Sequence, residues 1–213
     1  METLELMPTR IRITSILKKA IFSGEIKSGD ELSLTDVAGK LGVSRTPVRE
    51  AFQTLASEGL ITLRMNKGAI VNRIDEKFIK DIFEMRALME SEAAAKAAIN
   101  GMETDGLLKR LYELQKNLPS VDTATYEALN SDVHMSIWKA ADNAKLQNYL
   151  MELWNGPSTG HSIPETKVHY EKSTEEHILI LNYIKDGNVE GARAEMRHHI
   201  MRSQENVLRA LVS

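Results

Sequence analysis

The sequence predicts a mainly α-helical fold in two domains, with three helices and a small β-hairpin over residues 1–73 and an all-helical bundle over residues 74–213. Apolar residues recur at helical spacing along most of the chain, whereas residues 60–72 follow the shorter period of strands. Charge also differs between the two parts. Residues 1–73 carry eleven Lys and Arg against eight Asp and Glu, and residues 74–213 carry sixteen against twenty-two. This asymmetry favours contact between the first domain and a polyanion such as nucleic acid.

The first domain is predicted to begin with a helix over residues 9–23 and to continue with a shorter helix from about residue 34. Ser33 and Asp36 match an N-terminal capping box at the start of the shorter helix. Gly42 lies where a helix end needs positive φ, and a further helix follows it. Two helices joined through such a turn are typical of a helix-turn-helix.

The second helix of this motif has an exposed face suited to DNA. The buried stripe that begins at Val48 leaves Arg45, Thr46 and Arg49 outside, near the N-terminal end of the helix. A helix-turn-helix places that end in the major groove, where Arg can pair with guanine and Thr with bases or phosphates. An exposed Arg considered alone is more often a solvated charge, so this interpretation depends on the motif around it.

A β-hairpin is predicted over residues 60–72, with a tight turn at Asn66, Lys67 and Gly68, because glycine accepts the positive φ that such a turn needs. Three helices followed by a hairpin form a winged helix-turn-helix. The tip of the wing, including Gly68, can reach phosphate or an adjacent minor groove.

The second domain is predicted to be helical throughout, after a boundary at residues 73–76. Glycines and prolines divide it into segments. The predicted helices cover about 76–99, 104–117, 122–141, 144–155, 169–186 and 189–211. Residues 156–167 are predicted to form an irregular loop.

The composition excludes several classes of protein. The chain has no cysteine, and therefore neither disulfides nor thiolate metal sites. It contains no apolar run long enough to cross a membrane, and its N-terminal residues lack the order of a signal peptide. Its helices also lack the basic face of a membrane-surface protein. We therefore expect a cytoplasmic protein that does not bind membranes.

The segments of the first domain that carry a family resemblance are residues 28–30 (SGD), Leu32, residues 41–51 (LGVSRTPVREA), Leu55, Glu58-Gly59-Leu60, Gly68 and Val71. With these residues the domain resembles the GntR family of bacterial transcription regulators. The resemblance implies that Arg45, Thr46 and Arg49 contact DNA, with Gly68 at the tip of the wing.

The second domain carries further family-like segments, which are residues 83–90 (FEMRALME), residues 130–134 (NSDVH), residues 141–143 (ADN), Glu176-His177 and residues 196–200 (MRHHI). In these segments it resembles the FadR-type C-terminal ligand-binding domain, in its metal-binding type. The resemblance covers nearly the whole chain. It implies a helical bundle around one pocket, a homodimer, a double-stranded DNA operator as partner and a small organic acid as effector.

The metal site implied by this resemblance consists of Asn130, His134, His177 and His199. Residues four apart, such as the first two, point from one helix face into a shared cavity. Three neutral imidazoles suit Zn²⁺, Ni²⁺ or a similar divalent ion. The family's usual first ligand is Asp, and the neutral amide of Asn130 should weaken metal binding. In the alternative interpretation the histidines line a polar pocket and bind the effector directly.

Arg86 is the candidate for binding an anionic effector, because the resemblance places it on the first helix that lines the pocket. Its guanidinium could hold a carboxylate through two hydrogen bonds. A structural ion pair with Glu90, four residues further along the same helix, is an equally open alternative.

These features predict a sequence-specific DNA-binding regulator, and not an enzyme, whose operator binding responds to a small carboxylate in a metal-containing pocket. The main alternative is a regulator with a structural metal ion and no small-molecule effector. A metal-dependent hydrolase is a third hypothesis, but the sequence contains no H-E-x-x-H or comparable motif that would supply a general base.

Overall fold

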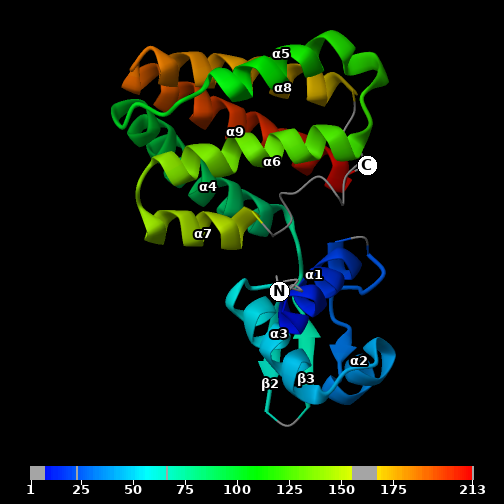
Figure 1. The fold of residues 1–213 in the computed structure, drawn as a ribbon. Coiled ribbons are helices and arrows are strands. Elements are labelled where there is room, and N and C mark those ends of the chain that lie inside the picture. Colours follow the sequence, from blue (N-terminus) through cyan, green and yellow to red (C-terminus); the bar gives the residue numbers. More distant parts are fainter. Residues whose placement is uncertain (1–7, 23, 66, 155–166, 213) are drawn as a thin grey trace, which may run out of the picture. The chain divides into compact units, whose positions relative to one another are not determined.

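The structure, a computed structural model, describes residues 8–22, 24–65, 67–154 and 167–212. These residues form two compact units, and the chain passes from the first to the second between Asp75 and Glu76 (Figure 1). The fold is mainly helical, as predicted, and the strands among the described residues all belong to the first unit.

The first unit contains α1 (Thr9–Phe22), β1 (Glu31–Leu32), α2 (Leu34–Leu41), α3 (Arg45–Ser57), β2 (Ile61–Arg64) and β3 (Gly68–Val71). Strands β2 and β3 form the predicted antiparallel hairpin, with Ile61 opposite Val71 and Arg64 opposite Gly68. The sequence does not predict β1, which pairs with the other side of β3 to give the order β1-β3-β2. A strand of two residues is too short to show a period. The winged helix-turn-helix is therefore confirmed, with one additional strand.

The turn between α2 and α3 has the chemistry predicted for Ser33, Asp36 and Gly42. The Asp36 N–H donates a hydrogen bond to the Ser33 hydroxyl at 3.3 Å, which caps α2. Gly42 ends this helix in the left-handed region, with a φ of 65°. Ser44 precedes α3 with an extended backbone, but its side chain makes no capping hydrogen bond. α3 buries the stripe that begins at Val48, and so its opposite face remains open to solvent.

The second unit contains α4 (Glu76–Ile99), α5 (Asp105–Asn117), the 3₁₀ turn η1 (Leu118–Ser120), α6 (Thr123–Ala140), α7 (Ala144–Trp154), α8 (Lys167–Lys185) and α9 (Val189–Val212). Each helix begins and ends within two residues of the predicted bounds, wherever the end is described. The loop predicted at residues 156–167 lies outside the described residues, except for Lys167, where α8 begins. None of the described helices is long and apolar enough to cross a membrane.

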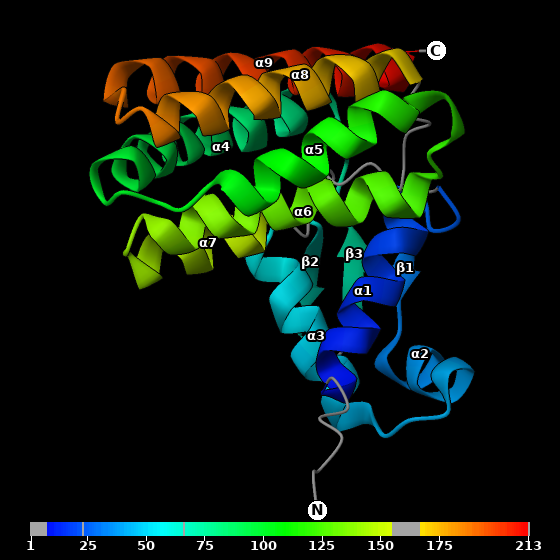
Figure 2. The same ribbon diagram turned by 45° about the horizontal axis from the view of Figure 1, so that its top comes forward.

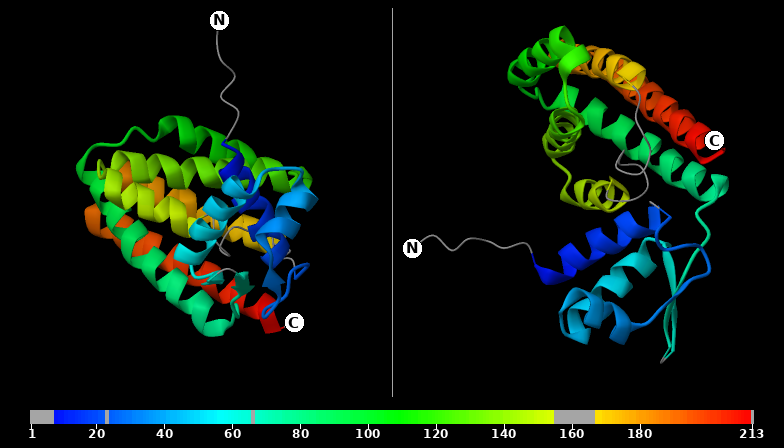
Figure 3. Two further views of the ribbon diagram at one scale, coloured as in Figure 1. Left: turned by 90° about the horizontal axis from the view of Figure 1, so that it is seen from below. Right: turned by 90° about the vertical axis from the view of Figure 1, so that its right-hand side faces the viewer.

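The bundle is organised around the contact between α4 and α9, which lie side by side and run in opposite directions (Figure 3). α4 contributes buried alanines to its packed faces, which are Ala93, Ala94, Ala95, Ala97 and Ala98. Small side chains let two helix axes approach closely. α8 packs against both α9 and α5 (Figure 2). This packing turns one face of α6, α8 and α9 toward the same part of the interior.

Candidate metal centre and nucleic-acid interface

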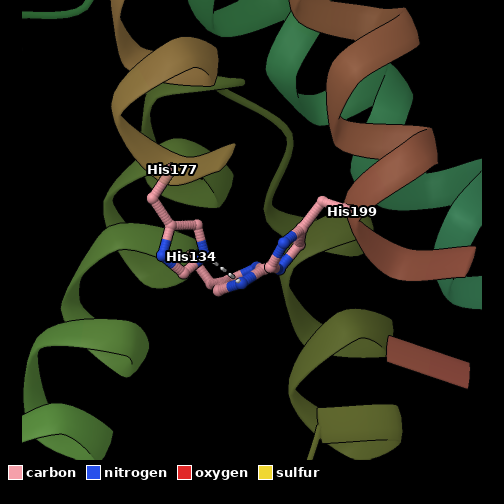
Figure 4. A group of neighbouring side chains, drawn as sticks. All are labelled: His134, His177 and His199. Carbon is pink, nitrogen blue, oxygen red and sulfur yellow. Dashed lines mark hydrogen bonds between the residues drawn. The ribbon is translucent and has the colours of Figure 1, made fainter. Parts of the chain in front are cut away.

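Three histidines from three helices meet inside the second unit (Figure 4). His134 comes from α6, His177 from α8 and His199 from α9, and all three side chains are buried. Each ring offers one nitrogen, and these three atoms lie within 4.8 Å of one another. The Nε2 atoms of His134 and His177 are 3.2 Å apart. The structure thus brings together the three histidines that the sequence singles out.

The ring of His134 is held by Glu90 of α4, whose side chain is fully buried. Both His134 Nδ1, at 2.6 Å, and Trp138 Nε1, at 3.1 Å, donate hydrogen bonds to Glu90 Oε2. Arg86 donates to the other oxygen, with Nε at 2.8 Å and Nη2 at 2.7 Å. Burial opposes ionisation of Glu90, but the charges of Arg86 and His134 outweigh it and lower the pKa of Glu90 to about 2. Because an ionised carboxylate only accepts, His134 donates a hydrogen bond from Nδ1 to Glu90, and its Nε2 atom faces His177.

A second glutamate and a second arginine hold His199 in the same manner. His199 Nδ1 donates to Glu176 Oε2 at 2.7 Å, and Arg202 donates to both oxygens of Glu176, with Nη2 at 2.7 Å from Oε2. Burial opposes ionisation of Glu176, but the hydrogen bonds from His199 and Arg202 outweigh it and lower its pKa to about 2. Burial is also the main cause that lowers the pKa of His199, to about 4, so this ring is neutral at pH 7.

His177 is the third imidazole of the group. Burial, followed by the charges of His199 and His134, places its pKa well below the usual value. Neutral imidazole is the form of histidine that binds metal ions. Nitrogen ligands of one tetrahedral Zn²⁺ ion, at about 2.0 Å from the metal, lie about 3.3 Å apart. The distance between His134 and His177 already matches this spacing. The donor set, its burial and the carboxylates behind two of the rings therefore fit an ion such as Zn²⁺ or Ni²⁺.

The residues next to these histidines lie where helical geometry puts them. Asn130 is half-buried on α6, four residues before His134, and its role as a fourth ligand stays a prediction from this spacing. Asp132 is exposed and pairs at 2.7 Å with an arginine of α5, so it does not join the group. His198 is exposed, whereas its neighbour His199 is buried, as expected for successive residues of a helix.

Arg86 forms the ion pair with Glu90 that the sequence leaves open as an alternative to effector binding. Its guanidinium also lies over the rings of Phe83 and Trp154, at 5.3 and 4.8 Å from their centroids. The Trp154 ring is in turn 4.7 Å from the ring of His134, measured between centroids. Arg86 is thus fixed beside the histidines, and its contact with an effector stays a prediction.

Besides the glutamates that hold two of the rings, the sequence also does not predict Trp154, His169 and Arg202 as parts of the site. His169 Nδ1 accepts hydrogen bonds from Arg202 Nη1 at 3.1 Å and from Asn206 Nδ2 at 2.7 Å. Burial, and then the charge of Arg202, lowers the pKa of His169 to about 4. Arg202 follows His199 by three residues, and this shared helix face is the signal that could have identified it.

The residues predicted to contact DNA lie in the first unit. Arg45, Thr46 and Arg49 are exposed at the start of α3. Gly68 differs from them, because it is half-buried and begins β3 with a φ of 88°. A Cβ atom on Gly68 would lie 1.9 Å from the carbonyl oxygen of Leu32, so β1 and β3 can approach only if this residue is glycine. Contact of these four residues with DNA stays a prediction.

Two protein-family models match the chain. The model described as "Bacterial regulatory proteins, gntR family" matches residues 9–71, and the model of the FCD domain matches residues 81–202. The first match spans the winged helix-turn-helix, and the second spans the histidine group.

Similar proteins of known role are transcription regulators rather than enzymes, so the hydrolase hypothesis finds no support. The gluconate operon transcriptional repressor of Bacillus subtilis is 34% identical over 69% of this chain and 59% of its own length. The Uxu operon regulator of Haemophilus influenzae is 30% identical over 90% of this chain and 79% of its own length.

Solved structures share the fold. The structure of E. coli McbR/YncC matches with a TM-score of 0.73 at 22% identity and covers 96% of this chain and 99% of its own. The Zn²⁺-bound FCD domain of TM0439 matches with a TM-score of 0.51 at 19% identity and covers 66% of this chain and 98% of its own. At such identities the likeness concerns the fold alone.

Proposed function

The chain belongs to the GntR family of bacterial regulatory proteins and carries an FCD domain, and we propose that its DNA binding responds to a small carboxylate anchored on a metal ion in that domain. The observation that carries this proposal is the buried group of His134, His177 and His199. A metal ion at this point would use all three imidazoles as ligands.

The protein side of the site is prepared for the ion. His134, His177 and His199 would hold it, with the side-chain oxygen of Asn130 as a fourth ligand. Two of the imidazoles already donate Nδ1–H to ionised carboxylates, which fixes the ring orientation and raises the basicity of the ligating nitrogen. The Zn²⁺ bound by the FCD domain of TM0439 supports Zn²⁺ as the ion.

Charge favours an anionic effector at this ion. The four proposed ligands are neutral, and the two glutamates behind them, Glu90 and Glu176, are each paired with an arginine. The positive charge supplied by the ion therefore remains for a ligand to neutralise. A carboxylate offers both charge and a hard oxygen donor, and Arg86 beside His134 is our candidate for a second contact to it.

On the DNA side, α3 enters the major groove with Arg45, Thr46 and Arg49, and the wing around Gly68 reaches the backbone or minor groove. A homodimer would place two such helices on an inverted repeat. The carboxylate regulates binding only if it favours one arrangement of this dimer over another, since equal affinity for both would shift nothing. The similarity to the gluconate operon repressor favours repression as the output.

Metal analysis of purified His177→Ala protein tests the site. We expect the substitution to remove the bound ion and to leave the first unit folded and able to bind DNA, because His177 belongs to the other unit. His198→Ala is the matched control, since this histidine is exposed beside a ligand and its loss should leave the metal content unchanged. If His177→Ala protein kept the metal content of the wild type, the assignment of His177 as a metal ligand would be wrong.

A further inference from the structure

Ser173 of α8 has a buried hydroxyl without a hydrogen-bond partner among the described residues. The residue is 1% exposed, so bulk water does not reach it. A serine or threonine within a helix can satisfy itself by bonding back to a carbonyl of the preceding turn. The adjacent Thr174 does so, with its hydroxyl 2.7 Å from the carbonyl oxygen of Tyr170. A buried hydroxyl that makes no hydrogen bond lowers the stability of the fold. Its presence indicates a hydrogen-bond partner from outside the described residues.

Ser173 lies on the face of α8 that also carries His177, four residues and about 6 Å away along the helix. Two contacts fix how this face meets α6. The rings of Tyr126 and Tyr170 stack with their centroids 3.9 Å apart, and the Nε2 atoms of His134 and His177 are 3.2 Å apart. The two helices run in the same direction (Figures 1 and 2), so positions between these contacts also correspond.

Asn130 of α6 lies at the level of Ser173 and Thr174, since Tyr126 meets Tyr170 and His134 meets His177. It is half-buried, and it lies four residues after Tyr126 and four before His134. The two helices therefore place an amide and an unpartnered hydroxyl at matching positions. The stretch where these two helices face each other is bounded by the stacked tyrosines at one end and by the histidines at the other. These two ends are roughly 11 Å apart along the helices.

The polarity of this stretch distinguishes between ligand groups. Ser173 and Asn130 are neutral, the half-buried Arg202 is paired with Glu176, and Arg86, our candidate for contact with the metal-bound carboxylate, is paired with Glu90. A second carboxylate placed here would lose its hydration without gaining a cation. A hydroxyl group could instead exchange hydrogen bonds with the serine Oγ and accept one from the asparagine Nδ2.

We propose that Ser173, together with Asn130, binds a hydroxyl group of the effector, which is therefore a hydroxycarboxylate with its hydroxyl about one helical turn, or roughly 6 Å, from the metal-bound carboxylate. This inference rests on the proposed metal-anchored carboxylate site and adds the part of the site that sets its specificity. Asn130 serves both, because an amide carries a ligating oxygen and two N–H donors.

Three acids of matched length test the inference by calorimetric titration of the metal-loaded full chain. 4-Hydroxybutanoate, pentanoate and glutarate place a hydroxyl, a methyl and a carboxylate at the same distance from the first carboxylate. We expect 4-hydroxybutanoate to bind at least about tenfold more tightly than the other two, because pentanoate leaves the buried polar groups unpaired.

Ser173→Ala should reduce the preference for 4-hydroxybutanoate over pentanoate to about threefold or less. Thr174→Val is the control. It removes a hydroxyl that already donates a hydrogen bond within its own helix, so the preference for 4-hydroxybutanoate should remain.

Equal binding of 4-hydroxybutanoate and pentanoate, tighter binding of glutarate, or a preference that survives in Ser173→Ala would overturn the inference. Acetate separates this failure from failure of the proposed function, because it needs only the position on the metal. If acetate binds the metal-loaded protein and none of the three longer acids binds more tightly, the hydroxyl site is wrong and the metal-anchored carboxylate stands. If acetate and the three acids all fail to bind, both are wrong.

Discussion

Single residues behind the histidines set the chemistry of the second unit. Glu90 and Glu176 each accept Nδ1–H from one imidazole and are held ionised by one arginine. This arrangement orients the ring and increases the electron density on the nitrogen proposed to bind the ion. In the proposed metal site, the glutamates would therefore act on metal affinity without touching the metal.

Glu176→Gln should weaken metal binding by roughly 10- to 100-fold, because a neutral amide accepts more weakly from His199 Nδ1 and no longer balances Arg202. A competition titration against a chelating indicator measures the change. Glu175→Gln is the control, since this neighbouring glutamate is exposed and should leave the affinity unchanged. Wild-type affinity in Glu176→Gln would show that the carboxylate does not position the ligand.

At the scale of the element, the wing depends on one close approach between strands. A side chain at position 68 would have to adopt a φ of 88°, which is strained for residues other than glycine. Its Cβ atom would also clash with the carbonyl oxygen of Leu32. We expect Gly68→Ala to lower the free energy of unfolding of the first unit by roughly 3 kcal/mol, through strain and overpacking. Urea denaturation of the full chain measures it. Gly39→Ala is the control, because nothing lies within 4 Å of its added Cβ atom, and a helical alanine should stabilise by roughly 0.5–1 kcal/mol.

The recognition helix α3 yields a separate prediction. Arg49→Ala should weaken binding to an operator fragment by about 1–3 kcal/mol if Arg49 pairs with a base, while thermal unfolding stays unchanged because the side chain is exposed. Fluorescence anisotropy, on a fragment selected from genomic DNA by the wild-type protein, measures the affinity. Lys116→Ala removes an exposed cation from the other unit and should leave the affinity as it is. Equal losses in both variants would indicate a general charge effect instead.

Elements were predictable from the sequence where a pattern was long enough to repeat. The helices of the bundle show apolar periodicity over eleven or more residues, whereas β1 has two residues and η1 three, too few for any period. The histidines were predictable from a resemblance in local segments. Their carboxylate partners were not, because Glu90 is 44 residues from His134 and meets it only through the packing of α4 on α6.

At the scale of the whole molecule, acid should destabilise the metal-free protein. The folded chain keeps the pKa of His199 and His169 at about 4 and that of His177 well below the usual value, while unfolded histidines titrate near 6.5. The unfolded state therefore binds more protons below pH 6.5. Stability is complete above that pH and is lost as the pH falls toward 4. The buried glutamates, with pKa values of about 2, add a further loss only below about pH 4.5.

Thermal unfolding of chelated protein at pH 7, 6 and 5 checks this dependence. We expect the Tm to fall at each step, because each of the three histidines can lower the free energy of unfolding by up to about 1.4 kcal/mol per pH unit. The same Tm at pH 7 and pH 5 would contradict the burial of neutral imidazoles.

The dependence of carboxylate binding on metal is the most direct test of the regulator as a whole. Purified, untagged protein would be analysed for bound metal, and its thermal unfolding measured with and without acetate, before and after chelation. We expect one ion per chain and an acetate-induced rise in Tm that disappears on chelation, since a ligand that binds only the metal-loaded native state stabilises that state by mass action. A rise in Tm that survives chelation, or that occurs in protein without metal, would contradict a metal-anchored effector and assign the histidines to direct contact with the ligand.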